Sequence, residues 1–356
     1  MYLKLVQLLG FGIGGMFLAI ICNVILLRFS KSLGIRNKND VVVRWSNQSK
    51  PSLGGVSFFV VFVFASIAYS IVFGDDKNVF QNPEFVGLFG AGSVAFLMGL
   101  ADDAYNTRPL IKLSTQILCG FFFVITGSSI HLFHMEGPDA IVTVIWVIVV
   151  MNSLNMLDNM DGITGTTVFF ILLSCLLSNW LIFEFNTNIF TLINISVIGA
   201  IVGFLTMNIH PSKLFMGDAG SQFIGLFVAF FSMQSHWNVS YETESPSWLG
   251  MCIALVAFTP AAVDTLTVVI NRLKRGQSPM VGGKDHTTHH LVYAGLSDRK
   301  VWYVFIIIGA IACLLSVAMV NLVRLDTELP VVFFVSYFLF VFILLYRNTI
   351  KYKAPK

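Results

Sequence analysis

The sequence is poor in charge. Asp, Glu, Lys and Arg together make up 12% of its 356 residues, whereas 56% of the residues are hydrophobic. This balance excludes an ordinary soluble domain, because such domains carry about twice that share of charge. Long apolar runs are typical instead of a polytopic membrane protein.

Cysteine is also scarce. All five cysteines fall in apolar runs and no CxxC pair occurs, so neither a disulfide framework nor a cysteine metal site is predicted. We do not expect a cleavable signal peptide either, because the first apolar run (residues 5–27) can span a bilayer and carries its positive charges after the run. No repeat or second domain is visible, so we expect a single integral-membrane domain over residues 1–356.

Apolar runs of nearly spanning length or longer recur along the whole chain. Only helices satisfy their own backbone in lipid at these lengths. We therefore predict an all-α polytopic membrane protein with about eleven transmembrane helices. The predicted spans are residues 5–28, 52–73, 85–101, 113–127, 140–157, 162–183, 189–207, 221–236, 248–269, 301–323 and 329–348.

Lys and Arg divide unequally between the two faces, and this bias sets membrane orientation. The division is 19 against 3, which predicts an outer N-terminus and a cytoplasmic C-terminus. The poorer face holds Lys4, Lys77 and Arg324. The richer face holds Arg28, Lys31, Arg36, Lys38, Arg44, Lys50, Arg108, Lys112, Lys213, Arg272, Lys274, Arg275, Lys284, Arg299, Lys300, Arg347, Lys351, Lys353 and Lys356.

The stretch Asn208–Ser221 (NIHPSKLFMGDAGS) has the composition of an anion and metal site. Its glycines let the backbone approach a ligand closely. A helix that opens at Ser221 would offer free N–H groups to a phosphate. Asp218 is a hard oxygen ligand of the kind that Mg²⁺ prefers. A tight turn with a helix N-cap is the alternative.

Two carboxylates, Asp102 and Asp103, end the third span. Neighbouring side chains on a helix diverge by about 100°, so one can face a pocket while the other orients it. The alternative is a topology marker, although acidic residues contribute little to topology. Lys112 follows as a phosphate contact or as a snorkelling anchor.

Polar residues recur every third position at the end of the fifth span: Asn152, Asn155, Asp158 and Asp161. They form a stripe of oxygen ligands on the predicted cytoplasmic side. Polar contacts between helices are the alternative, but two Asp residues are costly for that purpose within a membrane span.

The last predicted cytoplasmic loop is basic. Arg272 and Arg275 are three residues apart and can share one helical face. His286, His289 and His290 have a spacing that can hold zinc, yet no HExxH or nearby cysteine supports it. Donors to a diphosphate are favoured, and a basic loop beside anionic lipid remains the alternative.

Together these motifs favour substitution at a diphosphate, with one lipid substrate and one water-soluble substrate. In this order they resemble the polyprenyl-phosphate N-acetylhexosamine-1-phosphate transferase family, including a PxxGG-like element at Lys50–Gly55. The resemblance implies that undecaprenyl phosphate attacks a UDP-N-acetylhexosamine on the cytoplasmic face of a bacterial inner membrane. It implies the lipid bilayer as a partner and no nucleic acid, and it leaves a homodimer open.

The resemblance also implies residue roles. Asp218 would bind Mg²⁺, or Mn²⁺ in its place, with Asn155 as its partner. Asp102 would be a base or a positioning group for the lipid phosphate, and Asp103 would complete the catalytic set with Asp218. The residues expected to contact substrates are Lys112, Asn152, Asp158, Asp161, Asn208, Arg272, Arg275, His286, His289 and His290.

The chain departs from the family pattern at two places. Asn159 replaces the first glycine of DGxDG, and we expect the turn to persist because Asn tolerates the left-handed conformation. Thr287 stands at the first histidine of HxHH, with His286 one residue earlier. Three adjacent histidines, usual in the muramyl-pentapeptide branch, are absent. UDP-N-acetylglucosamine is therefore favoured, while another UDP-N-acetylhexosamine and a secondary transporter remain alternatives.

Overall fold

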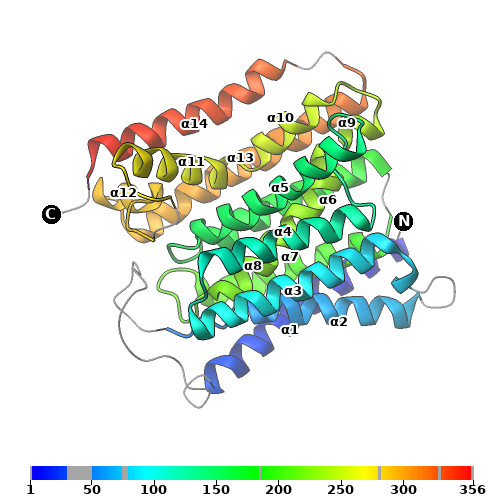
Figure 1. Cartoon of the computed structure of the whole chain (residues 1–356). Coiled ribbons are helices and arrows are strands. Elements are labelled where there is room, and N and C mark those ends of the chain that lie inside the picture. Colours follow the sequence, from blue (N-terminus) through cyan, green and yellow to red (C-terminus); the bar gives the residue numbers. More distant parts are fainter. Residues whose placement is uncertain are drawn as a thin grey trace.

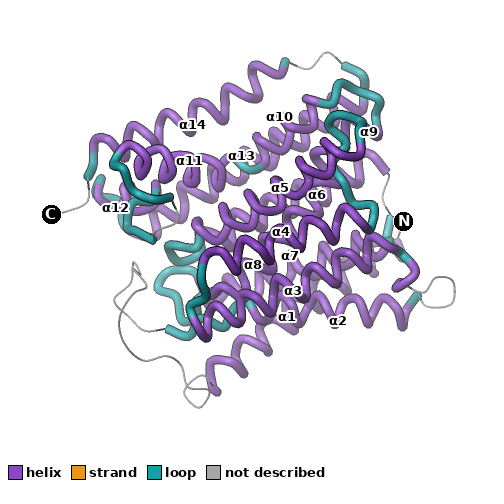
Figure 2. Tube along the Cα trace, in the orientation of Figure 1, coloured by secondary structure: helices purple, strands orange, loops and turns teal. Residues whose placement is uncertain are grey.

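The computed structural model of the chain describes residues 2–29, 50–73, 79–183, 186–279, 282–327 and 330–353. Over these ranges all regular structure is helical, as predicted, and no strand occurs (Figure 1, Figure 2). The elements are α1 (Tyr2–Phe29), α2 (Val56–Val72), the 3₁₀ turn η1 (Val79–Gln81), α3 (Pro83–Tyr105), α4 (Pro109–Ile125), α5 (Glu136–Leu157), α6 (Ile163–Phe183), α7 (Ile189–Asn208), α8 (Gly217–Ser232), the π-helical turn η2 (Met233–Trp237), α9 (Val239–Glu242), α10 (Trp248–Ala257), α11 (Thr259–Lys274), α12 (Thr287–Tyr293), α13 (Asp298–Arg324) and α14 (Val331–Lys351).

The long helices lie side by side, and their ends gather at two opposite ends of the molecule (Figure 1). Helix covers most of each predicted span. In the described part of the chain, seven helices are long and apolar enough to cross a membrane, or eight when α10 and α11 count as one span. The apolar helices α2 and α4, with 17 residues each, are shorter. The chain is thus a multi-pass membrane protein, and eleven crossings with an outer N-terminus stay predictions.

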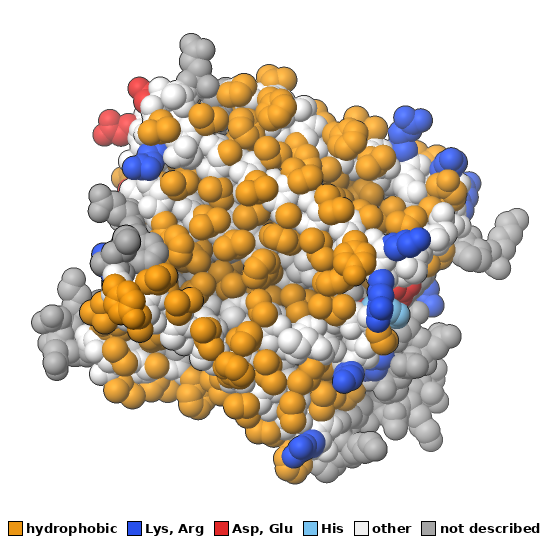
Figure 3. Space-filling view, turned by 180° about the vertical axis from the view of Figure 1, so that it is seen from behind, with side chains coloured by type: hydrophobic (Ala, Val, Ile, Leu, Met, Phe, Trp, Pro, Cys, Tyr) orange, Lys and Arg blue, Asp and Glu red, His pale blue; other side chains and the backbone are white. Residues whose placement is uncertain are grey.

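Hydrophobic side chains cover a broad area of the surface, and Lys and Arg gather along one edge of it (Figure 3). This edge belongs to the end where α14 finishes, which we call the basic end and which carries exposed Arg108, Arg275, Arg347 and Lys351. The predicted charge division also rests on residues outside the described ranges: Lys31, Arg36, Lys38, Arg44, Lys77 and Lys356.

The predicted span 248–269 is bent rather than straight. Helices α10 and α11 meet at 85°. Pro260 lies in the first turn of α11, where its missing N–H is not needed, but it cannot continue α10. Thr259 donates its hydroxyl to the Val256 carbonyl at 2.7 Å and so satisfies one acceptor at the end of α10. The bend makes α11 a separate helix.

Glycines bring three helices together where α8 begins. A Cβ on Gly55 would lie 2.0 Å from the Cα of Gly220, and a Cβ on Gly99 would lie 2.3 Å from the carbonyl oxygen of Asp218. Helices α2 and α3 therefore pack directly against the first turn of α8, as small residues permit between membrane helices. This packing fixes the position of Asp218.

Candidate active site

The stretch Asn208–Ser221, which we call the acidic loop after Asp218, enters a helix earlier than predicted. Helix α8 begins at Gly217, not at Ser221, and Gly217 takes the left-handed φ of +77° that glycine adopts without strain. The carboxylate of Asp103, on α3, accepts hydrogen bonds from the N–H groups of Asp218 (3.0 Å) and Ala219 (2.9 Å). Asp103 thus occupies N–H groups of the first turn that were predicted to face a phosphate, and it positions Asp218.

Asp102 is held from two sides at the end of α3. The N–H and the hydroxyl of Thr107 both donate to its Oδ1, at 2.8 and 2.7 Å. Lys112, in the first turn of α4, forms an ion pair with Oδ2. Asp102 is 4% exposed, so its orientation is fixed by these contacts. Lys112 consequently serves first as the counter-charge of Asp102.

The polar row of α5 reaches Asp218. Asn155 donates its amide to Oδ1 of Asp218 at 2.6 Å and to the hydroxyl of Ser221 at 2.8 Å. Its carbonyl oxygen remains the atom suited to a cation.

Asn152 lies one turn earlier on α5 and belongs to a different network. It donates to Gln116 on α4 at 2.6 Å, and Gln116 donates to Gln222 on α8 at 3.2 Å. Asn152 therefore links helices, as its alternative interpretation held, and the structure leaves its predicted substrate contact untested.

Negative charge accumulates around Asp158, just after α5. Burial raises the pKa of Asp158 to about 7, and the negative charges of Asp218, Asp103 and Asp161 add to the rise. Such an excess of carboxylates favours a cation between them.

The same carboxylates can be compared with the ligands that Mg²⁺ usually takes. Mg²⁺ typically takes one or two carboxylates together with waters and substrate phosphates. Among the described residues, no three His, Cys, Asp or Glu side chains are grouped so that they could hold a metal ion by themselves. Asp218 and the Asn155 carbonyl oxygen would therefore hold Mg²⁺ only together with waters and substrate phosphates, and the metal stays a prediction.

Asp161 and Asn208 organise the loop before α8. Asp161 accepts hydrogen bonds from the N–H (3.1 Å) and hydroxyl (2.8 Å) of Ser212 and from His210 (3.2 Å). Asn208 is 4% exposed, accepts from the Gly162 N–H at 2.9 Å and donates to the Leu214 carbonyl at 2.8 Å. Both side chains thus make protein contacts that support the loop, and their predicted substrate contacts stay predictions.

The PxxGG-like element pairs with the same loop. The N–H groups of Gly54 and Gly55 donate to the carbonyls of Phe215 and Met216, both at 2.9 Å. Lys50 lies 3.8 Å from Asp161 and donates to the Ser212 hydroxyl at 3.0 Å. The element before α2 therefore holds the acidic loop against α8, and Lys50 adds a positive charge that the motif analysis did not assign to the site.

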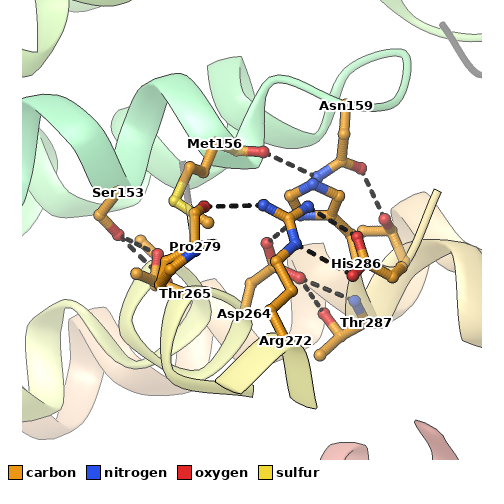
Figure 4. Close-up of polar contacts among 12 residues, drawn as sticks. Ser153, Met156, Asn159, Asp264, Thr265, Arg272, Pro279, His286 and Thr287 are labelled. Carbon is orange, nitrogen blue, oxygen red and sulfur yellow. Dashed lines mark hydrogen bonds and ion pairs between the residues drawn. The ribbon is translucent and has the colours of Figure 1, made fainter. Parts of the chain in front are cut away.

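Arg272 is bound within the protein. Its guanidinium donates twice to Asp285, at 3.0 and 2.7 Å. It also donates to the Pro279 carbonyl at 2.8 Å (Figure 4). Although burial opposes ionisation of Asp285, the hydrogen bonds and charge of Arg272 and a hydrogen bond from Arg275 lower its pKa to about 2. Arg272 therefore shapes the basic loop, whereas the exposed Arg275, also paired with Asp285, stays closer to solvent.

His286 and Thr287 share one fully buried carboxylate on α11, Asp264. His286 Nδ1 lies 2.8 Å from Asp264 Oδ2, and the N–H and hydroxyl of Thr287 donate to Oδ1 at 2.8 and 2.6 Å (Figure 4). These contacts anchor the start of α12 on α11. His286 is thus an anchor, and its predicted substrate contact stays untested.

His289 and His290 follow on α12 and are both buried. Burial lowers the pKa of His289 to about 3 and also lowers the pKa of His290, so both rings are neutral at pH 7. His290 Nδ1 donates to the backbone carbonyl of Tyr352, because a carbonyl only accepts. Its Nε2 is then an acceptor, which suits a sugar hydroxyl better than a phosphate oxygen.

Comparisons with known proteins agree with this arrangement. Residues 85–236 match the model of glycosyl transferase family 4, a range that holds Asp102, Asp103, the α5 row and Asp218. The chain is 25% identical over 291 residues to the decaprenyl-phosphate N-acetylglucosaminephosphotransferase of Mycolicibacterium smegmatis, covering 74% of this chain and 71% of the relative. It is 23% identical over 276 residues to the probable undecaprenyl-phosphate N-acetylglucosaminyl 1-phosphate transferase of Bacillus subtilis (73% and 71% covered). The phospho-N-acetylmuramoyl-pentapeptide-transferase of Lactococcus lactis is 26% identical over 302 residues (78% and 85% covered).

The chain is thus similar to polyprenyl-phosphate N-acetylhexosamine-1-phosphate transferases, which confirms the resemblance inferred from its motifs, and it is a transferase. This similarity gives meaning to the positions at which the chain departs from the family motifs.

Asn159 replaces a glycine of the family motif in a way that was not expected. The turn persists, as expected. The φ of Asn159 is not positive, however, so the left-handed conformation expected at this residue is wrong, and Gly162, with φ of +78°, adopts that conformation instead. The Asn159 amide donates to the Met156 carbonyl at 3.1 Å and accepts from the Thr288 hydroxyl at 2.6 Å (Figure 4). This transferase thus ties the end of α5 to the histidine helix α12.

We expect the Asn159–Thr288 contact to be energetically coupled. In a double-mutant cycle of Asn159→Ala and Thr288→Val, the coupling free energy is expected to be about 1 kcal/mol, the usual net value of one hydrogen bond. Thermal unfolding in detergent measures it. Thr115→Val, at a hydroxyl that bonds within its own helix, is the control and should combine additively with Asn159→Ala. Additive Asn159→Ala and Thr288→Val effects would contradict the coupling.

Proposed function

We propose that this transferase moves N-acetylglucosamine 1-phosphate from UDP-N-acetylglucosamine to undecaprenyl phosphate. The products are UMP and undecaprenyl-diphospho-N-acetylglucosamine, a first lipid-linked intermediate of a cell-envelope polysaccharide. The observation that carries the proposal is the gathering of Asp102, Asp103, Asp158 and Asp218 around the first turn of α8. This cluster lies at the basic end, which we expect to face the cytoplasm.

The proposed reaction is a displacement at the β-phosphorus of the nucleotide sugar. An oxygen of the lipid phosphate forms the new P–O bond, and the bond to the UMP oxygen breaks with its electron pair going to UMP. Mg²⁺, when bound, would neutralise phosphate oxygens. Lys112 and Lys50 add positive charge on either side of the carboxylates, as a diphosphate substrate requires.

Each residue of the site would have a role set by its position. Asp218 and Asn155 would hold the metal, and Asp103 would keep Asp218 in place through the first N–H groups of α8. His290, neutral and with Nε2 as an acceptor, would receive a hydroxyl or amide proton of the sugar. The absence of three adjacent histidines supports N-acetylglucosamine over the muramyl-pentapeptide nucleotide.

Purified protein tests the proposal directly. It is incubated with radiolabelled UDP-N-acetylglucosamine, undecaprenyl phosphate and Mg²⁺, and an organic-soluble product that a chelator abolishes is expected. Parallel reactions with UDP-N-acetylgalactosamine and the muramyl-pentapeptide nucleotide identify the sugar. Greater turnover of either competitor would overturn the sugar assignment. Absence of lipid product from all three would overturn the reaction.

We expect Asp102 to act by positioning rather than by removing a proton. The second pKa of a phosphomonoester is near 6, so the lipid phosphate is already largely dianionic at neutral pH. The fixed contacts of Asp102 with Thr107 and Lys112 agree with a positioning role. Asp102→Asn should therefore lose the same fraction of wild-type turnover at pH 6 and pH 9. Recovery of the variant at pH 9 would instead identify Asp102 as the base.

A further inference from the structure

A pocket opens at the basic end, between α12, α13 and the last turns of α14. Its volume is about 570 Å³, and none of the predicted site residues lines it. Its walls are apolar and include Leu291 of α12, Val304 of α13 and Leu344 and Leu345 of α14. The motifs therefore leave this pocket without a function.

The mouth of the pocket is cationic. Arg347 and Lys351 line it from α14, and their spacing of four residues places them on one helical face. Both side chains are exposed. They follow the apolar body of α14, so they lie where a predicted span leaves the hydrocarbon region.

An unsatisfied donor lies on the same turn of α14, at the residue that follows Arg347. In the described part of the chain, the side-chain nitrogen of Asn348 is buried and has no hydrogen-bond partner, and Asn348 lines the pocket. A buried donor without a partner is costly. A phosphate at the mouth would pair with Arg347 and Lys351, and Asn348 would donate to it when its side chain turns toward the mouth.

We propose that this pocket binds an anionic membrane phospholipid, with its phosphate at Arg347, Asn348 and Lys351 and its acyl chains along the leucine walls. Basic pockets between helices near the membrane surface bind lipid headgroups in this way. The apolar walls favour a lipid over a free phosphate or a nucleotide, neither of which would cover them.

The pocket touches the candidate active site through one residue. Tyr352 lines the pocket, and its backbone carbonyl accepts the hydrogen bond that fixes the tautomer of His290. A phospholipid bound in the pocket would restrain Tyr352 and so keep His290 in the orientation that binds the sugar. This coupling rests on the proposed function, and it predicts that anionic phospholipid lowers the KM for the nucleotide sugar about fivefold with little change in kcat.

Lipid retention by the full chain tests the binding site without any turnover. Native mass spectrometry in neutral detergent compares phosphatidylglycerol with phosphatidylcholine of the same acyl chains. Arg347→Gln with Lys351→Gln should weaken phosphatidylglycerol binding about tenfold, because each cation near the surface contributes to binding an anionic lipid. Lys300→Gln with Lys353→Gln, two exposed cations outside the pocket, is the matched control and should bind as wild type does.

Undecaprenyl phosphate is tested in the same assay, to distinguish binding of a membrane phospholipid from binding of the proposed lipid substrate. Loss of phosphatidylglycerol with undecaprenyl phosphate retained supports the proposal. Equal binding of both glycerolipids, an unchanged double variant, or selective loss of undecaprenyl phosphate would overturn it. Because the readout is lipid mass, the result stands whether or not the protein turns over UDP-N-acetylglucosamine.

Discussion

Asp218→Asn is expected to lower turnover about a thousandfold, since an amide in place of the carboxylate removes the charge that would hold the metal at the diphosphate. The substitution keeps the shape of the side chain, and the backbone contacts of Asp218 with Asp103 remain. The loss should therefore arise in the chemistry and not in folding. The radiolabel assay measures turnover, and thermal unfolding checks the fold.

Asp326→Asn is the control for this variant. Asp326 is an exposed carboxylate directly after α13 with φ of +50°, a conformation that Asn adopts readily. It should keep wild-type activity. An Asp218→Asn enzyme with more than about a tenth of wild-type turnover would show that Asp218 is not the principal ligand, because a metal-bound carboxylate is worth several kcal/mol to the transition state.

Gly55→Ala is expected to reduce turnover at least about a hundredfold, the size of effect that a displacement of about 1 Å has at a catalytic site. The new Cβ would lie 2.0 Å from the Cα of Gly220 and 2.8 Å from the carbonyl oxygen of Met216. Both neighbours are backbone atoms and cannot move aside alone. The start of α2 must then separate from α8 and carry the paired acidic loop with it.

A second glycine provides the comparison. Gly14 on α1 has nothing within 4 Å of its ideal Cβ position, so Gly14→Ala adds the same methyl group without a clash. Activity and thermal unfolding of Gly14→Ala should match wild type. If Gly55→Ala is equally harmless, the close packing of α2 on α8 does not position the site.

Hydropathy was sufficient to predict the helices, because an apolar run that crosses lipid can satisfy its backbone hydrogen bonds in few structures other than a helix. It could not predict the bend at Pro260, because a proline in the first turn of α11 looks the same in sequence whether one helix continues or two helices meet. The start of α8 was placed late for a related reason. Its first turn is capped by Asp103 of another helix, which no local pattern records.

The candidate site was predicted in part. The carboxylates were found because charged residues are costly within membrane spans, and Asp102, Asp103 and Asp218 do come together, with Asn155 beside them. Asp264 and Asp285 were missed as partners of the histidine and arginine motifs, because each pairs with a residue that is not its neighbour in sequence. An acidic residue directly before the first histidine was the available signal for Asp285.

The contacts that build the acidic loop join distant parts of the polypeptide. Lys50 and Ser212 are 162 residues apart, and Asp103 and Ala219 are 116 residues apart. When the ribosome has delivered α1 to α7 into the bilayer, the proposed metal-binding cluster is therefore still incomplete. Biogenesis must hold the early carboxylates in an unfinished assembly, and the enzyme becomes competent only when its later helices arrive.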